Sequence, residues 1–138
     1  MRIALSIEYN GANYFGWQKQ KTHKEKTIQY YIDKAISKIA DEKVSTICAG
    51  RTDTGVHAFS QIVHFDTNKK RLDYKWLNGI NSNTPNDIII KNIYHVDNDF
   101  HARYSALART YRYVILNQEY PSTYLSSNAL HLNKKISI

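Results

Sequence analysis

The sequence predicts an α+β domain of the ferredoxin-like class, with the order βαββαβ and two helices packed on one face of an antiparallel sheet. The main observation is a change of hydrophobic period along the chain, from two to about 3.6 and back, which gives strand, helix, two strands, helix and strand in turn. A second observation is the length of 138 residues, which suits one domain, or one domain and a fragment of a second.

The first half of this order begins with Ile3–Tyr9, where apolar and polar residues alternate as in a strand with one buried face. Residues 10–26 hold glycine and asparagine breakers, three aromatic residues and several lysines, so they predict a long basic loop. Structureless loops of this length are usually functional or disordered. From Thr27, a suitable N-cap, apolar residues recur at helical spacing as far as Ile39 and predict the first helix.

The second half consists of two strands, a helix and a strand. Residues 44–49 and 59–65 are rich in β-branched and aromatic residues and flank a polar loop. Residues 72–80 have apolar side chains at helical spacing and are followed by a cluster of breakers. Residues 88–96 then predict a buried strand that completes the sheet.

Composition limits the classes of partner and the compartment. Nineteen Lys and Arg against twelve Asp and Glu give a net charge of +7, which favours nucleic acid or an acidic membrane surface. The single cysteine, Cys48, cannot form an internal disulfide, and no Cys and His spacing resembles a closed zinc site. Glu8 interrupts the N-terminal apolar stretch, and no run of about 18 apolar residues exists. We therefore expect a cytoplasmic protein without a metal or a membrane segment.

The loop at residues 50–57 is the first candidate site. Arg51 and Asp53 are two residues apart, so in an extended loop they project to the same side, and the guanidinium would keep the carboxylate ionised. An ionised carboxylate can act as a nucleophile. The alternative is that Asp53 caps a turn and Arg51 is a solvated surface charge, which is the usual role of such residues and the one favoured by these residues alone.

The second candidate site is the segment from Phe100 to Tyr113, which holds three arginines and three tyrosines. Arginine pairs with phosphates and tyrosine rings stack on bases, so this mixture suits RNA. The alternative is that Tyr111 and Tyr113 are ordinary strand residues, because tyrosine is common in sheets. The residues alone leave both alternatives open.

Residues 53–55 also match the Asp-Thr-Gly tripeptide of aspartic proteases, so a dimer could pair two copies of Asp53. Such a pair must share a proton, whereas Arg51 would stabilise both groups as carboxylates and leave no general acid. His57, beside the loop, could contact a phosphate or the substrate, while His64, within a strand, suits a structural role. No metal role follows for either histidine.

The run Gly50–Ala58 resembles the catalytic loop of the TruA family of tRNA pseudouridine synthases. Further motifs support the resemblance in the family's usual order, and together they cover roughly residues 3–117: Phe15–Gln20, Leu77-Asn78, Pro85–Ile88, Phe100–Arg103 and Arg109–Tyr113.

This resemblance implies an isomerase that detaches uracil from its ribose and rejoins it through carbon, without a cofactor. Asp53 would be the nucleophile, and Arg51 would pair with it and occupy the space left by the flipped base. The ring of Tyr111 would cover the uracil, and its hydroxyl would assist proton removal. The implied substrate is the anticodon stem-loop of tRNA near positions 38–40, and the implied substrate-binding residues are Trp17, Lys19, Lys21, His57, Arg103 and Arg109.

Family members are nearly twice as long as this chain, with a second half that packs its sheet against the first and supports a homodimer. We therefore expect residues 1–117 to form an RNA-binding domain that carries the catalytic loop, ending in a strand at 110–117. Residues 118–138 would begin a connection to a second half that is absent from this chain, with a new element starting at residue 133. Thr84 also departs from the family, which usually has an apolar residue there. A noncatalytic RNA-binding module is the alternative function.

Overall fold

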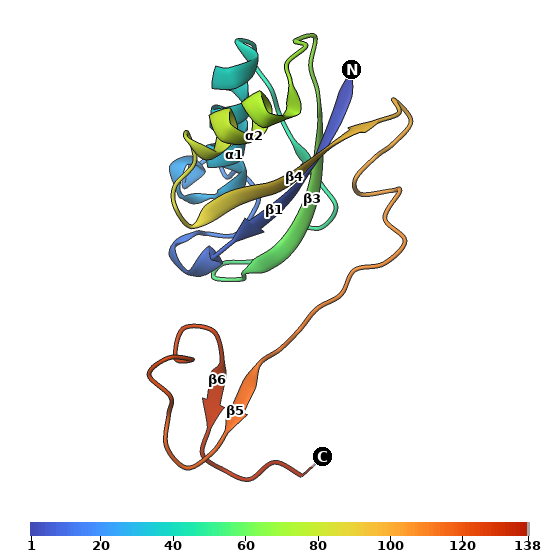
Figure 1. The fold of residues 1–138 in the computed structure, drawn as a ribbon. Coiled ribbons are helices and arrows are strands. Elements are labelled where there is room, and N and C mark those ends of the chain that lie inside the picture. Colours follow the sequence, from blue (N-terminus) through green and yellow to red (C-terminus); the bar gives the residue numbers. More distant parts are fainter. Residues whose placement is uncertain (138) are drawn as a thin grey trace. The chain divides into compact units, whose positions relative to one another are not determined.

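Six elements in the order βαββαβ fill residues 2–96 of the structure, a computed structural model that describes residues 1–137 apart from the side chain of Lys24. Two short 3₁₀ turns, η1 (Gly11–Asn13) and η2 (Lys24–Lys26), lie within the basic loop. The six elements are β1 (Arg2–Tyr9), α1 (Ile28–Ala40), β2 (Ile47–Cys48), β3 (Ala58–Asp66), α2 (Asp73–Asn81) and β4 (Ile88–Val96) (Figure 1).

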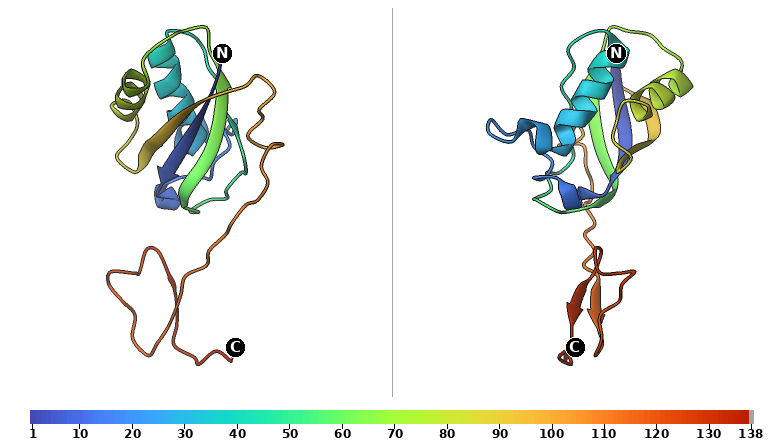
Figure 2. Two further views of the ribbon diagram at one scale, coloured as in Figure 1. Left: turned by 45° about the vertical axis from the view of Figure 1, so that its right-hand side comes forward. Right: turned by 90° about the vertical axis from the view of Figure 1, so that its left-hand side faces the viewer.

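The four strands form one antiparallel sheet in the order β2-β3-β1-β4. Strands β1 and β2 are therefore parallel with β3 between them, and β3 and β4 are parallel with β1 between them. Helices α1 and α2 connect these two pairs and lie on the same face of the sheet (Figures 1 and 2). This is the split βαβ arrangement of the ferredoxin-like class, so the predicted fold is confirmed.

The hydrophobic core lies between the sheet and the two helices. Alternate residues of β1 face it, and Ile3 and Leu5 are paired with Phe65 and Val63 of β3 on the same face. The Phe65 ring meets the ring of Trp76 from α2 edge to face at 5.7 Å. No helix within residues 1–137 combines the length and the apolar character that crossing a membrane requires. The largest wholly buried apolar side chains are Trp17, Trp76, Phe65, Ile3, Leu5, Ile7, Ile28, Ile32, Ile36, Ile80 and Ile88.

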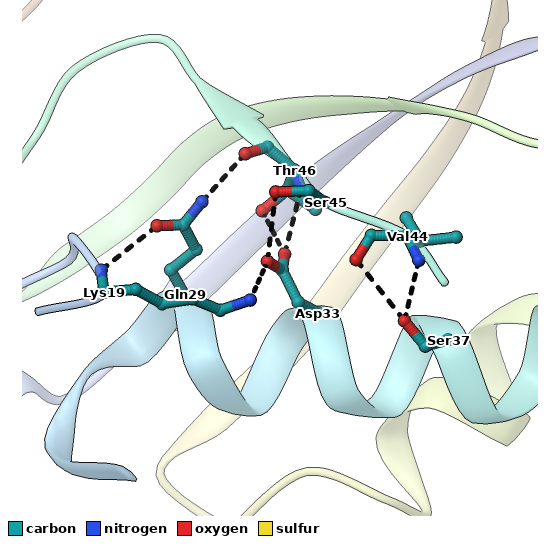
Figure 3. Close-up of polar contacts among 7 residues, drawn as sticks. All are labelled: Lys19, Gln29, Asp33, Ser37, Val44, Ser45 and Thr46. Carbon is teal, nitrogen blue, oxygen red and sulfur yellow. Dashed lines mark hydrogen bonds and ion pairs between the residues drawn. The ribbon is translucent and has the colours of Figure 1, made fainter. Parts of the chain in front are cut away.

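The strand predicted at residues 44–49 is shorter in the structure, because α1 side chains bind the backbone of its first half. The hydroxyl of Ser37 accepts the Val44 N–H at 2.9 Å. The Asp33 carboxylate accepts the backbone N–H of Thr46 at 2.9 Å and the Thr46 hydroxyl at 2.6 Å (Figure 3). These backbone groups therefore do not pair with β3, and the ladder is limited to β2.

The chain divides into two compact units, Met1–Leu107 and Ala108–Ile138. This division precedes by ten residues the boundary drawn at residue 117 from the sequence. In the second unit β5 (Ile115–Asn117) and β6 (Leu130–Leu132) form a parallel pair, so the strand predicted at 110–117 is formed only in its last three residues. Residues 133–137 form neither helix nor strand, and Ile138 lies outside the described residues.

Candidate active site

The candidate catalytic residue, Asp53, lies in the loop between β2 and β3, and its side chain is exposed. The Val56 N–H donates to the Asp53 carbonyl at 3.2 Å and closes a turn. Gly55, within this turn, has φ +79°, and a methyl group added there would meet nothing within 4 Å. The turn is therefore tight, and it can be approached from the side of Gly55.

The loop that carries Asp53 is held from behind by the first half of the basic loop. The hydroxyl of Tyr9 also lies 2.7 Å from the hydroxyl of Thr52. Together with three hydrogen bonds to residues 11–17, this contact holds the loop at both ends of the turn, so it is the backbone of the turn that is fixed rather than one side chain. Two backbone bonds join Trp17 N–H to Thr52 O at 2.9 Å and Gly55 N–H to Tyr14 O at 3.2 Å, and the His57 side chain accepts the Gly11 N–H at its Nδ1 at 3.0 Å.

Two glycines allow this close approach. Gly16 has φ +79°, and a Cβ there would lie 2.6 Å from the Thr52 carbonyl oxygen and 3.1 Å from the Asp53 carbonyl carbon. A Cβ at Gly11 would lie 2.0 Å from the Val56 carbonyl oxygen. The first half of the basic loop therefore serves as a support for the candidate catalytic loop, which the sequence did not predict.

Arg51 and Asp53 do not pair within the part of the chain that the structure describes: neither an ion pair nor a hydrogen bond joins their side chains. Both side chains are exposed. An exposed ion pair gains little free energy in water, so solvation of the two groups separately is the physical reason for the difference from the predicted pairing.

Arg103, far from Arg51 in sequence, lies in the same region of the first unit. Burial raises the pKa of the Cys48 thiol, and the guanidinium groups of Arg51 and Arg103 both act in the opposite direction. Both arginines are therefore close enough to Cys48, at the end of β2, to influence its charge. The structure thus brings two of the predicted site residues to the end of the sheet where the candidate catalytic loop begins.

The turn that carries Arg103 is anchored by His64. The His64 side chain is 2% exposed, and its Nδ1 accepts the Ala102 N–H at 3.1 Å. His101 Nδ1 in turn accepts the N–H groups of Arg103 and Tyr104 at 3.2 and 3.3 Å. The structural role predicted for His64 is confirmed. Burial lowers the pKa of His64, with smaller contributions from Arg2 and His101 in the same direction.

Trp17 and Lys19, predicted to contact substrate, have other partners in the structure. The Trp17 side chain is wholly buried, with its ring 6.0 Å from that of Tyr9. The Lys19 ammonium forms an ion pair with Asp33, whose side chain is 2% exposed, and the Lys19 N–H donates to Gln29 at 3.1 Å (Figure 3). No local pattern in the sequence indicates this buried acceptor, so Lys19 was predicted as a surface cation.

The remaining predicted residue of the basic loop, Lys21, is exposed. It belongs to the outer part of this loop, together with the exposed residues Phe15, His23 and Lys26. The Phe15 ring lies 4.8 Å from the His23 ring, and the Lys26 ammonium lies 5.4 Å from the centre of the Phe15 ring. Flat rings beside cations can stack on bases and attract phosphates, so this outer part of the loop suits RNA.

Arg109 and Tyr111 belong to the second unit, and both are exposed there. Their relation to Asp53 stays a prediction from the resemblance. Within residues 1–137, no group of three or more His, Cys, Asp and Glu side chains could hold a metal ion. Two described surface hollows lie beside Arg2 and beside His95, and neither includes Asp53.

Sequence reasoning missed Tyr14 and Asp87. The Tyr14 hydroxyl donates to the Asp87 carboxylate at 2.5 Å, and the Asn10 N–H donates to the Asp87 carbonyl at 2.9 Å. The only sign in the sequence was that Asp87 belongs to the Pro85–Ile88 motif, to which no role was assigned.

Comparison with known proteins agrees with this arrangement of fold and loop. A family model described as tRNA pseudouridine synthase matches residues 5–105, which span most of β1, all of β2, β3 and β4, both helices and the loop of Asp53. The chain therefore belongs to the tRNA pseudouridine synthase family, and the predicted resemblance is confirmed. This assignment gives no support to the protease alternative.

Three bacterial relatives named tRNA pseudouridine synthase A illustrate the similarity. The protein of Colwellia psychrerythraea is 53% identical over 131 residues, which cover 95% of this chain and 50% of that protein. The protein of Aeromonas hydrophila is 50% identical over 136 residues, covering 99% and 50% respectively. That of Photorhabdus laumondii is 47% identical over 133 residues, covering 96% and 50%. The chain spans about half the length of these curated relatives.

Proposed function

We propose that the protein containing this chain isomerises uridine to pseudouridine in the anticodon stem-loop of tRNA, near positions 38–40. The observation that carries the proposal is the exposed carboxylate of Asp53 on a loop whose backbone is fixed from behind, in a chain of the tRNA pseudouridine synthase family. A fixed backbone with one approachable acid is what a nucleophile acting on a bulky polymer requires.

In the proposed reaction Asp53 acts as the nucleophile while the N1–C1′ bond of uridine breaks and a C5–C1′ bond forms. The C5 hydrogen leaves as a proton, and N1 gains a proton, so no oxidant, reductant or cofactor is needed. Tyr111 covers the uracil ring, and its hydroxyl assists removal of the C5 proton. The atoms balance in the same way whether Asp53 attacks the base or the sugar.

The uridine must leave its stack before Asp53 can reach it, which costs a few kcal/mol. Arg51 offsets part of this cost by occupying the space of the extruded base. In the RNA complex, where water is displaced, Arg51 also pairs with Asp53, because an ion pair gains more when it is less solvated.

The phosphates of the stem-loop are held by the exposed cations near this loop. Arg103 lies in the same region as Arg51, and Lys21 belongs to the outer part of the basic loop. Arg109 adds a further phosphate contact from the second unit, and His57 lies next to the turn of Asp53. The proposed assembly is a cytoplasmic homodimer of the whole protein bound to tRNA.

The test is the release of tritium from a tRNA transcript labelled at C5 of uridine. The whole protein should release label, and Asp53→Ala should reduce the rate to background, because the nucleophile is lost. Asp97→Ala removes another exposed acid, in the loop after β4, and should leave the rate unchanged. Absence of release by the wild-type protein, or equal release by the Asp53→Ala variant, refutes the proposal.

A second candidate is that this chain alone binds RNA without turnover. The exposed rings of Phe15 and His23 and the Lys26 ammonium, which lies over the Phe15 ring, favour it. In that case the 138-residue chain should bind tRNA with an affinity that falls with salt, and should release no label.

A further inference from the structure

Asp87 lies outside the candidate catalytic loop but is connected to it through Tyr14. The Tyr14 hydroxyl donates to the Asp87 carboxylate at 2.5 Å. The Tyr14 side chain is 7% exposed, and its ring packs edge to face on Tyr31 at 5.9 Å. Burial first, and then the bond to Asp87, raise the pKa of Tyr14 above its usual value, so the hydroxyl remains a donor.

The backbone of Tyr14 makes the second half of the connection. Its carbonyl accepts the Gly55 N–H at 3.2 Å, within the turn that also carries Asp53. The Asp87 carbonyl accepts the Asn10 N–H at 2.9 Å. Asp87 therefore binds both the start and the middle of residues 10–17, the supporting segment in the first half of the basic loop. A continuous path of contacts therefore runs from Asp87 through Tyr14 to the turn of Asp53.

This path cannot act by touching the RNA base directly, because the Tyr14 ring is buried and its hydroxyl is already bonded. It also differs from the other contacts that support the turn. Those contacts all come from residues 9–17, at the end of β1 and in the first half of the basic loop, whereas Asp87 belongs to the connection between α2 and β4. The pair thus ties the turn of Asp53 to the second βαβ half of the sheet.

We propose that Tyr14 and Asp87 are positioning residues, whose hydrogen bond holds the turn of Asp53 in the orientation needed for nucleophilic attack. This inference rests on the proposed function, because Asp53 must be the nucleophile for its orientation to matter. Displacement of a reacting group by about 1 Å can cost about 100-fold in rate. Loss of the bond should accordingly affect the chemical step more than the binding of tRNA.

The kinetic test uses the whole protein as its gene encodes it. Tyr14→Phe keeps the buried ring and removes only the donor, and Asp87→Ala removes the acceptor. Each should lower kcat roughly 10-fold with KM within about twofold of wild type. The double variant should be no slower than either single variant, because both break the same bond. Asp87→Asn keeps an acceptor oxygen and should retain most of kcat.

Tyr30→Phe is the matched control, because the Tyr30 hydroxyl also donates to a carboxylate, that of Glu25, at 3.3 Å and away from the candidate catalytic loop. It should leave kcat unchanged. A second readout is independent of activity: hydrogen exchange of the Gly55 amide, measured by NMR on this chain. Exchange should be faster in Tyr14→Phe than in wild type or Tyr30→Phe, while the Leu5 amide in the centre of the sheet remains protected.

The inference would be overturned by a kcat within about twofold of wild type in Tyr14→Phe, or by a lower kcat with unchanged exchange at Gly55. Additive effects in the double variant would also overturn it, since the two residues would then act separately. If the wild-type protein shows no turnover, the proposed function fails, whereas the exchange measurement still tests the mechanical link between Tyr14 and the turn.

Discussion

Asp33 shows how a single buried acid organises the surroundings of the candidate site. Its carboxylate accepts the backbone N–H and the hydroxyl of Thr46 and forms an ion pair with Lys19 (Figure 3). Removal of the carboxylate leaves a buried N–H and a buried hydroxyl without an acceptor. An unsatisfied buried group costs about 1 to 3 kcal/mol, and loss of one member of a buried ion pair costs more.

Asp33→Ala should therefore lower the free energy of unfolding by about 3 kcal/mol, as measured by urea denaturation. Glu8→Ala is the control, because Glu8 pairs with Lys91 at 3.2 Å where both side chains are about half exposed. That change should cost less than about 0.5 kcal/mol. Equal effects of the two substitutions would contradict the role assigned to the buried network.

His64 makes stability depend on pH. Burial lowers its pKa below the ordinary value of 6.5, so the unfolded chain binds the proton more readily than the folded chain. The stability that neutral His64 provides is complete above about pH 6.5 and is lost as the pH falls through the folded pKa. Protonation of Nδ1 would also remove the acceptor for the Ala102 N–H.

The free energy of unfolding should thus fall between pH 7.5 and pH 5, and it should fall less in His64→Asn. Asn keeps an acceptor oxygen near the position of Nδ1 but does not titrate. The comparison concerns the change with pH within each protein, since the smaller side chain also lowers stability at every pH. A variant that loses as much stability as wild type over this range would refute the assignment.

At the scale of elements, the support of one loop by another depends on where glycine is required. Gly16 and Gly55 share φ +79°, but only Gly16 abuts backbone, with Thr52 O at 2.6 Å from an added Cβ. Gly55→Ala should cost about 1 kcal/mol, from the positive φ alone. Gly16→Ala adds a backbone clash and should cost about 3 kcal/mol.

The two alanine variants also separate strain from displacement of Asp53. Tritium release by the whole protein should fall in Gly16→Ala, because the added methyl group pushes on the Asp53 backbone. Gly55→Ala, with open space around the new methyl group, should remain closer to wild type. The reverse order of the two rates would show that the supporting segment does not position the turn.

Strong periodicity explains which elements the sequence could predict. Residues 88–96 were predicted as a buried strand because an apolar run follows a cluster of breakers, and they form β4 with the same bounds. Their burial was predicted wrongly, since β4 lies at the edge of the sheet and only Ile88 and Ile90 are buried in it. Residues 44–46 were not predicted to leave the sheet. Their backbone groups bind the side chains of Ser37 and Asp33, which belong to α1 and lie 7 and 13 residues earlier in the chain. Local pattern carries no information about such tertiary hydrogen bonds.

The same limit applies to the candidate site. Asp53 and Arg103 were predicted from motifs, and in the structure the guanidinium groups of Arg51 and Arg103 both act to lower the pKa of the Cys48 thiol. Trp17 was predicted to bind substrate because it belongs to an aromatic and basic loop, yet it is wholly buried. Composition shows that such a loop can bind RNA, but it cannot show which of its aromatic residues the core retains.

For the molecule as a whole, the charge of +7 predicts that tRNA binding depends on salt. Each phosphate contact that is lost should reduce the slope of log Kobs against log salt concentration by about 1. Arg103→Ala should show this reduction together with weaker binding. Lys75→Ala makes the same change of charge at an exposed position of α2 and should leave the slope near wild type.

The two compact units lead to a prediction about folding. The buried apolar cluster is formed entirely by residues of the first unit, while β5 and β6 are a short pair whose Leu130 and Ile115 are about half exposed. A two-stranded pair is marginal by itself in water. Residues 1–107 should therefore unfold cooperatively in urea when produced alone, and residues 108–138 should show no cooperative transition.

A shorter fragment tests which part of the first unit is needed. In residues 1–96 the Arg2 guanidinium loses the carbonyls of Asn98 and Phe100, which it binds at 2.6 and 2.8 Å. His64 also loses the Ala102 N–H. Because these contacts cover the sheet on the side away from the helices, the urea midpoint of residues 1–96 should be lower than that of residues 1–107. Equal midpoints would mean that the turn carrying Arg103 docks without stabilising the sheet, and a noncooperative 1–107 fragment would mean that the first unit cannot fold by itself.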